Sequence, residues 1–313
     1  RGQYGQKSVT YPFFRDHEYT TFYNLVLRQS GQDWATTKIK DAMIAKVCED
    51  TNVETMDYRS CAVYINGEYW GLYNLREKQD EDYVITRYPD AVKGKIDIVK
   101  GNQNLNAGSA EEWVDLRKYV KQHDMTQLDS QNYVEERVDM YSLYDWLAIE
   151  AFIVNPDSGN VRRFKYDGGK WRWMLFDVDH ALKTSSSGNR LAMIMSEKGH
   201  GTGNNFWSHM QVAIMTNQKW RKEFVERYAE LLNTTLRPDR FHAIVDAMAD
   251  EIRTEMPAQI DRWDTHDSVE EWEQDIAEMK SIIDARWPIA VKELQSTFGL
   301  SDDRMAELFP NGY

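Results

Sequence analysis

A chain of 313 residues can bury a large core, and its 42% hydrophobic and 12% aromatic content excludes an intrinsically disordered protein. The formal net charge of −13 argues against nonspecific nucleic-acid or membrane binding, because both need basic patches. It does not exclude a phosphorylated ligand at a local basic or metal-filled site. No apolar run approaches the ~20 residues that cross a bilayer, so no transmembrane segment is expected.

The start of the chain shows no signal-peptide pattern, and we interpret Arg1 as an internal start. The two cysteines, Cys48 and Cys61, are too few for a zinc site. The sequence does not decide between a disulfide and two buried thiols. It therefore does not identify the cellular compartment of the protein.

The first hundred residues mix strand and helix signals. Residues 24–29 are expected to form a short strand. Residues 34–49 carry apolar side chains at four-residue intervals, which predicts an amphipathic helix. Asp33 or Ser30 is the expected cap of this helix.

A β-hairpin gives the clearest local signal. Residues 61–65 and 68–75 are strand-like and are joined by Asn66-Gly67, the dipeptide that type I′ turns favour. A helix is expected to begin near Asp80.

A strand, a loop and a helix are expected over residues 96–120. After a strand at 96–100, the Gly- and Asn-rich residues 101–110 are expected to form a loop. A helix is expected over 111–120.

A buried helix and a second hairpin are expected in the middle of the chain. Residues 140–151 place apolar side chains on one helical face, and Pro156 disfavours helix at the residue before it. Residues 161–166 and 171–176 are strand-like and flank a Gly-rich turn.

The last third should be helical after a long polar loop at 185–205. Its apolar side chains fall into helical stripes: Trp220, Phe224, Tyr228 and Leu231; Phe241, Val245, Met248 and Ile252; Trp272, Ile276, Met279 and Ile283. The order predicts an α+β fold with a small mixed sheet lobe over residues 1–100, truncated at its start, and a larger helical lobe over 101–313. Together they would form one domain.

One group of polar residues in the middle of the chain has the composition of a binding or catalytic site. Asp157 and Asn160 follow the buried helix, and the hairpin then returns the chain so that Asp177 and Asp179 lie near them. Carboxylate and amide oxygens are the ligands that Mg²⁺ prefers, and it usually binds one or two carboxylates plus phosphate oxygens. The sequence therefore predicts a metal or phosphate site here.

Phosphoryl transfer uses such a set, with one carboxylate for the attacking hydroxyl and an Asn and a second Asp for the metal. Each residue also has a plainer interpretation. Asp157 could be an ordinary turn residue, and Asp179 could cap a helix beginning at His180.

Several motifs carry a family resemblance. They are residues 25–31 (LVLRQSG), 63–78 (VYINGEYWGLYNLREK), 155–160 (NPDSGN) and 170–179 (KWRWMLFDVD). Together they resemble the CotH (spore coat protein H) kinase family over about residues 1 to 185. The helices beyond resemble that family only in type.

The resemblance implies an atypical kinase-like fold and an ATP-dependent transfer of phosphate to a protein Ser or Thr with Mg²⁺ or Mn²⁺. It implies Asp157 as the catalytic aspartate or a residue that shares metal binding. Asp177 and Asn160 would be metal ligands, and Asp179 an additional carboxylate. A secreted or cell-surface location follows from the family, not from the residues.

The resemblance also suggests residues for the nucleotide. Glu77 would pair with a phosphate-binding lysine, which is expected near Lys7 or upstream of the chain. The hairpin turn at Asn66-Gly67 could cover the nucleotide. Arg28 could contact phosphate or be an ordinary ion-pair partner.

Two other functions stay open. Some relatives are similar to non-catalytic cell-surface or adhesion proteins, and kinase-like folds also carry out adenylylation or glutamylation. The sequence does not identify the substrate protein or the oligomeric state.

Overall fold

The computed structural model describes residues 5–14, 19–101, 103–157, 159–186, 188–196 and 208–312. The strands are β1 (Val9–Thr10), β2 (Thr21–Phe22), β3 (Leu25–Arg28), β4 (Tyr58–Ile65), β5 (Glu68–Glu77), β6 (Ile96–Lys100), β7 (Asn104–Ala107), β8 (Arg162–Tyr166) and β9 (Arg172–Met174). The helices are η1 (a 3-10 helix, Gly31–Asp33), α1 (Lys40–Val47), α2 (Glu81–Arg87), α3 (Glu111–Gln122), α4 (Leu128–Glu135), α5 (Met140–Phe152), α6 (Arg190–Ile194), α7 (Ser208–Thr216), α8 (Gln218–Asn233), α9 (Pro238–Arg253), α10 (Met256–Trp263), α11 (Val269–Phe298) and α12 (Asp302–Leu308).

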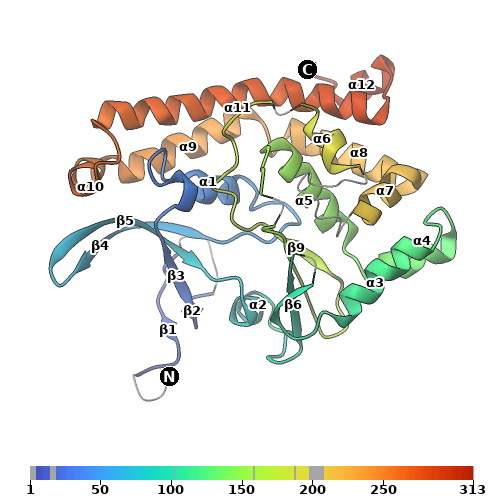
Figure 1. Ribbon diagram of the computed structural model, residues 1–313, viewed down its shortest axis with the longest axis horizontal. Coiled ribbons are helices and arrows are strands. Elements are labelled where there is room, and N and C mark those ends of the chain that lie inside the picture. The colour runs from blue at the N-terminus through green and yellow to red at the C-terminus, as the bar shows by residue number, and fades with distance from the viewer. Residues whose placement is uncertain are drawn as a thin grey trace.

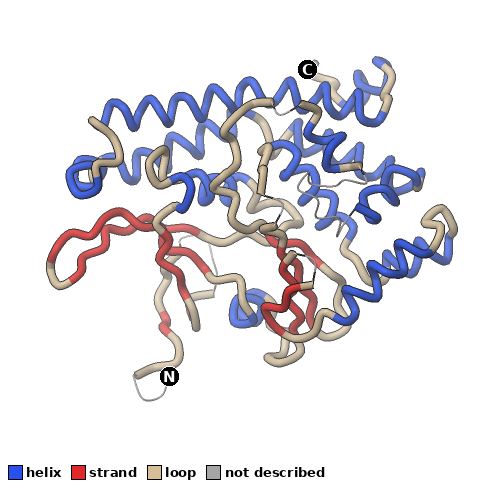
Figure 2. The backbone as a smooth tube through the Cα atoms, in the orientation of Figure 1, coloured by secondary structure: helices blue, strands red, loops and turns tan. Residues whose placement is uncertain are grey.

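The predicted α+β architecture is confirmed. The strands gather on one side of the molecule and the C-terminal helices on the other, with α9 and α11 running side by side (Figures 1 and 2). The strand orders are β1-β2, β3-β5-β4 and β7-β6-β8-β9. All of these pairs are antiparallel, so the expectation of a mixed sheet is corrected.

The predicted lobe boundary at residue 100 falls between β6 and β7, inside one sheet. The division into two lobes therefore stays a prediction. No helix in the described ranges combines the length and apolarity needed to span a membrane.

The first hairpin forms as its turn dipeptide predicts. Asn66 and Gly67 have φ angles of 54° and 87°, the positive values that a type I′ turn requires at both central residues. The β4–β5 hairpin projects from the body of the molecule in Figure 1. The helix expected near Asp80 is α2, and the Asp80 carboxylate accepts the backbone N–H groups of Asp82 and Tyr83 at 3.0 and 3.3 Å.

The helix predicted over 34–49 begins only at Lys40. The carboxylate of Asp33 accepts the backbone N–H groups of Thr37 (3.1 Å) and Lys40 (2.9 Å), so the chain first wraps around this buried side chain. Lys38 has a φ of 66°, which interrupts helical geometry just before α1. Asp33 therefore accepts the backbone N–H of Lys40, the first residue of α1, although Asp33 itself lies outside the helix. Ser30 donates to the Lys38 carbonyl instead of capping the helix.

Two predicted loops contain short elements. Within 101–110, β7 pairs with β6, but it is only four residues long and mostly exposed, and two of its residues are asparagines, which strands disfavour. Within 185–205, α6 begins after Asn189, whose side chain accepts the Ala192 N–H at 2.8 Å. Residues 187 and 197–205 of that loop lie outside the described residues.

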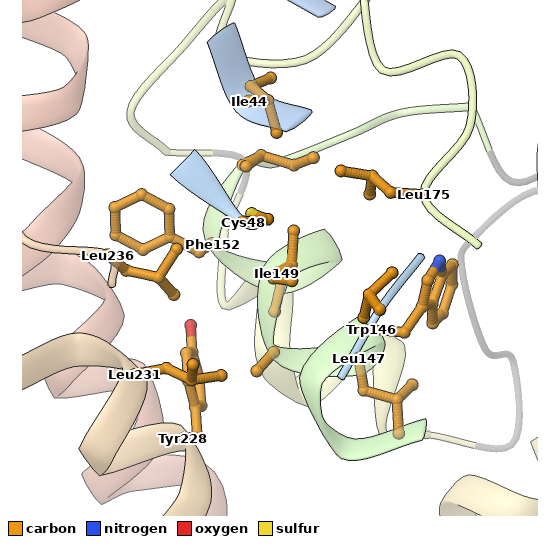
Figure 3. Packing of buried hydrophobic residues seen from close by; sticks show 14 of the residues in the cluster. Ile44, Cys48, Trp146, Leu147, Ile149, Phe152, Leu175, Tyr228, Leu231 and Leu236 are labelled. Atoms are coloured by element: carbon orange, nitrogen blue, oxygen red, sulfur yellow. The ribbon is translucent and has the colours of Figure 1, made fainter. Parts of the chain in front are cut away.

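The core is built around α5, which is buried on nearly every face. Figure 3 shows Phe152 on the side of α5 toward Leu236 and the C-terminal helices, and Trp146 on the other side, near Leu175. The apolar stripes predicted for the last third are buried as expected. Cys48 is fully buried and Cys61 half-buried, and both thiols are free, so a disulfide between them is excluded.

The C-terminal end of α5 is fixed by a side chain from α11. Arg286 donates to the carbonyls of Ala151 and Phe152 at 3.0 and 2.8 Å and pairs with the buried Glu293. The last carbonyls of a helix have no partner within it, so these bonds satisfy a terminus that would otherwise be buried without partners. Arg286 therefore fixes the position at which the turn after α5 begins.

Candidate functional site

Three predicted site residues meet where two turns face each other. Asp157 and Asn160 lie between α5 and β8, and Asp177 follows β9. The Asn160 side-chain amide donates to one carboxylate oxygen of Asp157 and one of Asp177, each at 2.7 Å. The hairpin thus returns the chain to the turn as predicted, and the two carboxylates face one point.

Both turns contain strained backbone. Val154 and Asp177 have φ angles of 51° and 61°, in the left-handed region that residues other than glycine seldom adopt, and the strain is greater for the β-branched Val154 than for an aspartate. Such conformations cost about 1–3 kcal/mol each and are concentrated at functional sites. The first turn is held by Asp157, which receives the Gly159 N–H at 2.9 Å and donates its own N–H to Asn155 at 3.1 Å.

Arg28, at the end of β3, bridges the two acidic residues after β9. Its guanidinium donates to Asp177 and, at 2.6 Å, to Asp179. The exposed fraction of the side chain is 30% for Asp177 and 7% for Asp179, so Asp177 is the more accessible to a ligand. Burial alone would lower the pKa of Arg28, but Asp41, Asp177 and Asp179 together raise it. Burial raises the pKa of Asp179 although Arg28 opposes this.

Gly31, which has no side chain, allows the loop after β3 to contact Asp179. The backbone N–H of Gln32 donates to Asp179 at 3.1 Å, which brings the loop after β3 against the carboxylate. A Cβ atom on Gly31 would lie 1.9 Å from the Asp179 carboxylate oxygen.

Replacing Gly31 with alanine is therefore expected to destabilise the protein and to displace Asp179. The φ of 57° strains any Cβ-bearing residue by about 1–2 kcal/mol, and the clash adds to this. Urea denaturation measures the loss. Gly67→Ala is the matched control, because Gly67 has a φ of 87° but open space around its Cβ position. An equal loss of stability in both variants would show that the clash between the new methyl group and Asp179 adds nothing to the backbone strain.

The site opens into a polar pocket of about 510 Å³. It is lined by Arg28, Gln29, Gly31, Gln32, Asp157, Asp177, Asp179 and His180. Within the described ranges, no three His, Cys, Asp or Glu side chains are grouped so that they could hold a metal by themselves. Asp157, Asp177 and the amide of Asn160 nevertheless fit a cation such as Mg²⁺, which commonly takes one or two carboxylates and completes its shell with phosphate and water.

Two cations lie near this site, outside the residues that line the pocket, and were missed from the sequence. Lys100 and Arg162 stand directly opposite each other on β6 and β8. The Arg162 guanidinium lies 3.4 Å from the centre of the Phe176 ring, and the Lys100 ammonium lies 5.7 Å from it. Burial lowers the pKa of Arg162 to about 10, although Asp177 opposes this. Like charges at opposed strand positions repel, so this pair favours an anionic ligand beside Asp177.

Other predicted nucleotide contacts lie elsewhere. Glu77, at the end of β5, pairs with Arg87 and accepts the backbone N–H of Asp57 at 3.0 Å. Its partner is thus an arginine of α2, not the expected lysine. Asn66 and Gly67 form the exposed tip of the projecting hairpin, outside the residues that line the pocket. Lys7 precedes β1 and does not line it either.

Fold and site together define an α+β protein in which two strained turns bring carboxylates and an amide to one polar pocket. The chain belongs to the CotH kinase protein family, whose family model matches residues 6–288. This membership makes it a kinase-like protein and confirms the resemblance of its motifs. The match reaches well into α11, so the helical region beyond residue 185 belongs to the family domain too. No curated protein sequence matches the chain closely enough to count as a relative.

Proposed function

We propose that this protein transfers the γ-phosphoryl group of ATP to a Ser or Thr hydroxyl of a protein substrate, with Asp157 as the catalytic base and Mg²⁺ or Mn²⁺ at Asn160 and Asp177. The observation that supports this most directly is the shared contact of Asp157 and Asp177 with the Asn160 amide, at 2.7 Å each, at the edge of an open pocket. Membership of a kinase family supports the same reaction class.

The protein's residues would divide the work as follows. Asp157 orients the substrate hydroxyl and takes its proton as the new O–P bond forms and the bond to the ADP oxygen breaks. Asp177 and the side-chain oxygen of Asn160, after rotation of its amide group, hold the metal. When bound, the divalent ion neutralises negative charge on the β- and γ-phosphates.

The cations around Asp177 would bind the phosphate chain. Arg28 is held by Asp177 and Asp179 and lines the pocket. Lys100 and Arg162 flank Phe176 on the neighbouring sheet. Arginine can bind phosphate through two parallel bonds, so Arg28 is the residue that we assign to the role expected of a phosphate-binding lysine.

Thermal unfolding with ATP and Mn²⁺ tests the nucleotide site. A ligand that binds only the folded protein at about 100 times its Kd stabilises it by about 2.7 kcal/mol, which corresponds to a rise in Tm of roughly 3–8 °C. We expect this rise in the wild type and its loss in Asp177→Asn. Asp167→Asn is the matched control, because Asp167 lies in the exposed β8–β9 turn and pairs only with Lys95 in the described part of the chain. No rise in the wild type would favour a non-catalytic module on a degenerate kinase fold.

If ATP binds, mass spectrometry of the modified partner separates phosphate transfer from other nucleotide chemistry. Addition of a phosphoryl group supports the proposal. Addition of a nucleotidyl or glutamyl group would assign a different reaction to the same site.

A further inference from the structure

A buried carboxylate on α1 contacts the backbone between the two acidic residues that follow β9. Asp41 is 5% exposed, and one of its carboxylate oxygens accepts the backbone N–H of Val178 at 2.9 Å. The other oxygen pairs with Arg76 of β5, which is 1% exposed. Asp41 therefore links the helix, the first sheet and the site backbone.

The bonded N–H belongs to the peptide group that follows the strained residue. Asp177 has a φ of 61°, and the peptide joining it to Val178 must keep one orientation if the carboxylate is to stay beside Asn160. A hydrogen bond to a charged group contributes about 1.5–3 kcal/mol, which is comparable with the cost of the left-handed conformation. The single bond from Asp41 is thus strong enough to hold this backbone in place.

The partners of Asp41 fix it in turn. Arg76 also donates to the carbonyls of Met56 and Asp57 at 3.0 and 2.9 Å, so its guanidinium cannot turn away without losing those bonds. Burial alone would raise the pKa of Asp41, but Arg76 and Arg28 lower it below its usual value. The carboxylate is therefore ionised and available as an acceptor.

We propose that Asp41 is a positioning residue for the metal site: through the Val178 N–H it holds Asp177 in the conformation that presents its carboxylate to a divalent cation. This inference rests on the proposed function, because it assumes that Asp177 binds the metal. Asp41 does not line the pocket: it contacts the site through the Val178 backbone, and its charge also stabilises the Arg28 guanidinium.

Asp41→Asn tests the proposal with Mn²⁺ alone as the probe. The asparagine carbonyl can serve only one of the two donors, and the charged Arg76 makes the stronger bond, so the Val178 N–H loses its acceptor. Changes to residues that support metal ligands typically cost about 10–100-fold in metal affinity. We expect a loss of this size in a Mn²⁺ titration followed by electron paramagnetic resonance, well below the Tm of the variant. Asp41→Ala should lose at least as much.

Asp145→Asn is the matched control. Asp145 is as fully buried, pairs with Arg227 and accepts the Asn52 N–H, but it has no contact with the site. It should lose comparable stability and keep its Mn²⁺ affinity. If both Asn variants keep wild-type affinity, Asp41 is only structural, and the inference is wrong while the metal site stands. If the wild type itself binds no Mn²⁺, the metal site and the inference both fall.

Discussion

Asp157→Asn is expected to abolish most phosphate transfer while ATP and Mn²⁺ still bind. Loss of a positioned general base typically costs about 10²–10⁴-fold in rate. The asparagine oxygen can still accept the Gly159 N–H, so the turn should keep its shape. Transfer of labelled phosphate to a protein substrate gives the rate, and the ATP-dependent rise in Tm reports binding in the same variant.

The comparison with Asp177→Asn separates the two roles. That variant should lose both the transfer and the Tm rise, because we assign Asp177 to the metal. If Asp157→Asn also loses the Tm rise, Asp157 is a metal ligand and another group takes the proton. If the transfer rate is unchanged, Asp157 is an ordinary turn residue, as one interpretation of the sequence allowed.

The parts of the site that were predictable lie close together along the chain. One hairpin separates Asp157 and Asn160 from Asp177, and its two strand-like runs around a Gly-rich turn predict that the chain returns. Local rules of this kind also located the Asn66-Gly67 turn and the start of a helix near Asp80. Their success reflects short-range sterics and hydrogen bonding, which the sequence encodes directly.

The parts that could not be predicted depend on pairing between distant segments. Arg28 meets Asp177 across 149 positions, and Asp41 meets Val178 across 137. The opposition of Lys100 and Arg162 needs the β6–β8 register, which a single sequence does not reveal. The same limit explains Glu77, for which the family resemblance suggested a lysine partner but packing of α2 supplied Arg87.

The late start of α1 leaves an unusual lysine in the interior. Lys38 is 3% exposed, and its ammonium lies 3.7 Å from the centre of the Trp34 ring, with no hydrogen-bond partner in the described part of the chain. Burial lowers the pKa of Lys38 to about 7, and Asp33 offsets only part of this effect. Burying an unpaired charge is costly, so Lys38 should reduce stability wherever it is protonated.

The pH dependence follows from linkage. Between about pH 7 and pH 10 the unfolded chain keeps the Lys38 proton and the folded protein has lost it, so the free energy of unfolding rises with pH by about 1.4 kcal/mol per unit. Below pH 7 both states are protonated, and the folded state bears the full cost. Lys38→Met removes this term, so the variant should be more stable than the wild type by several kcal/mol at pH 6.

The measurement that decides is the difference in the free energy of unfolding between Lys38→Met and the wild type, followed across pH. We expect the stability advantage of Lys38→Met, measured by urea denaturation, to shrink by roughly 2–3 kcal/mol between pH 7 and pH 9. Other titrating groups cancel in this difference because both proteins share them. Lys121→Met, at an exposed position on α3, should show no such change. A constant gap would mean that Lys38 stays charged in the folded protein and that the ring of Trp34 and the nearby Asp33 stabilise its ammonium.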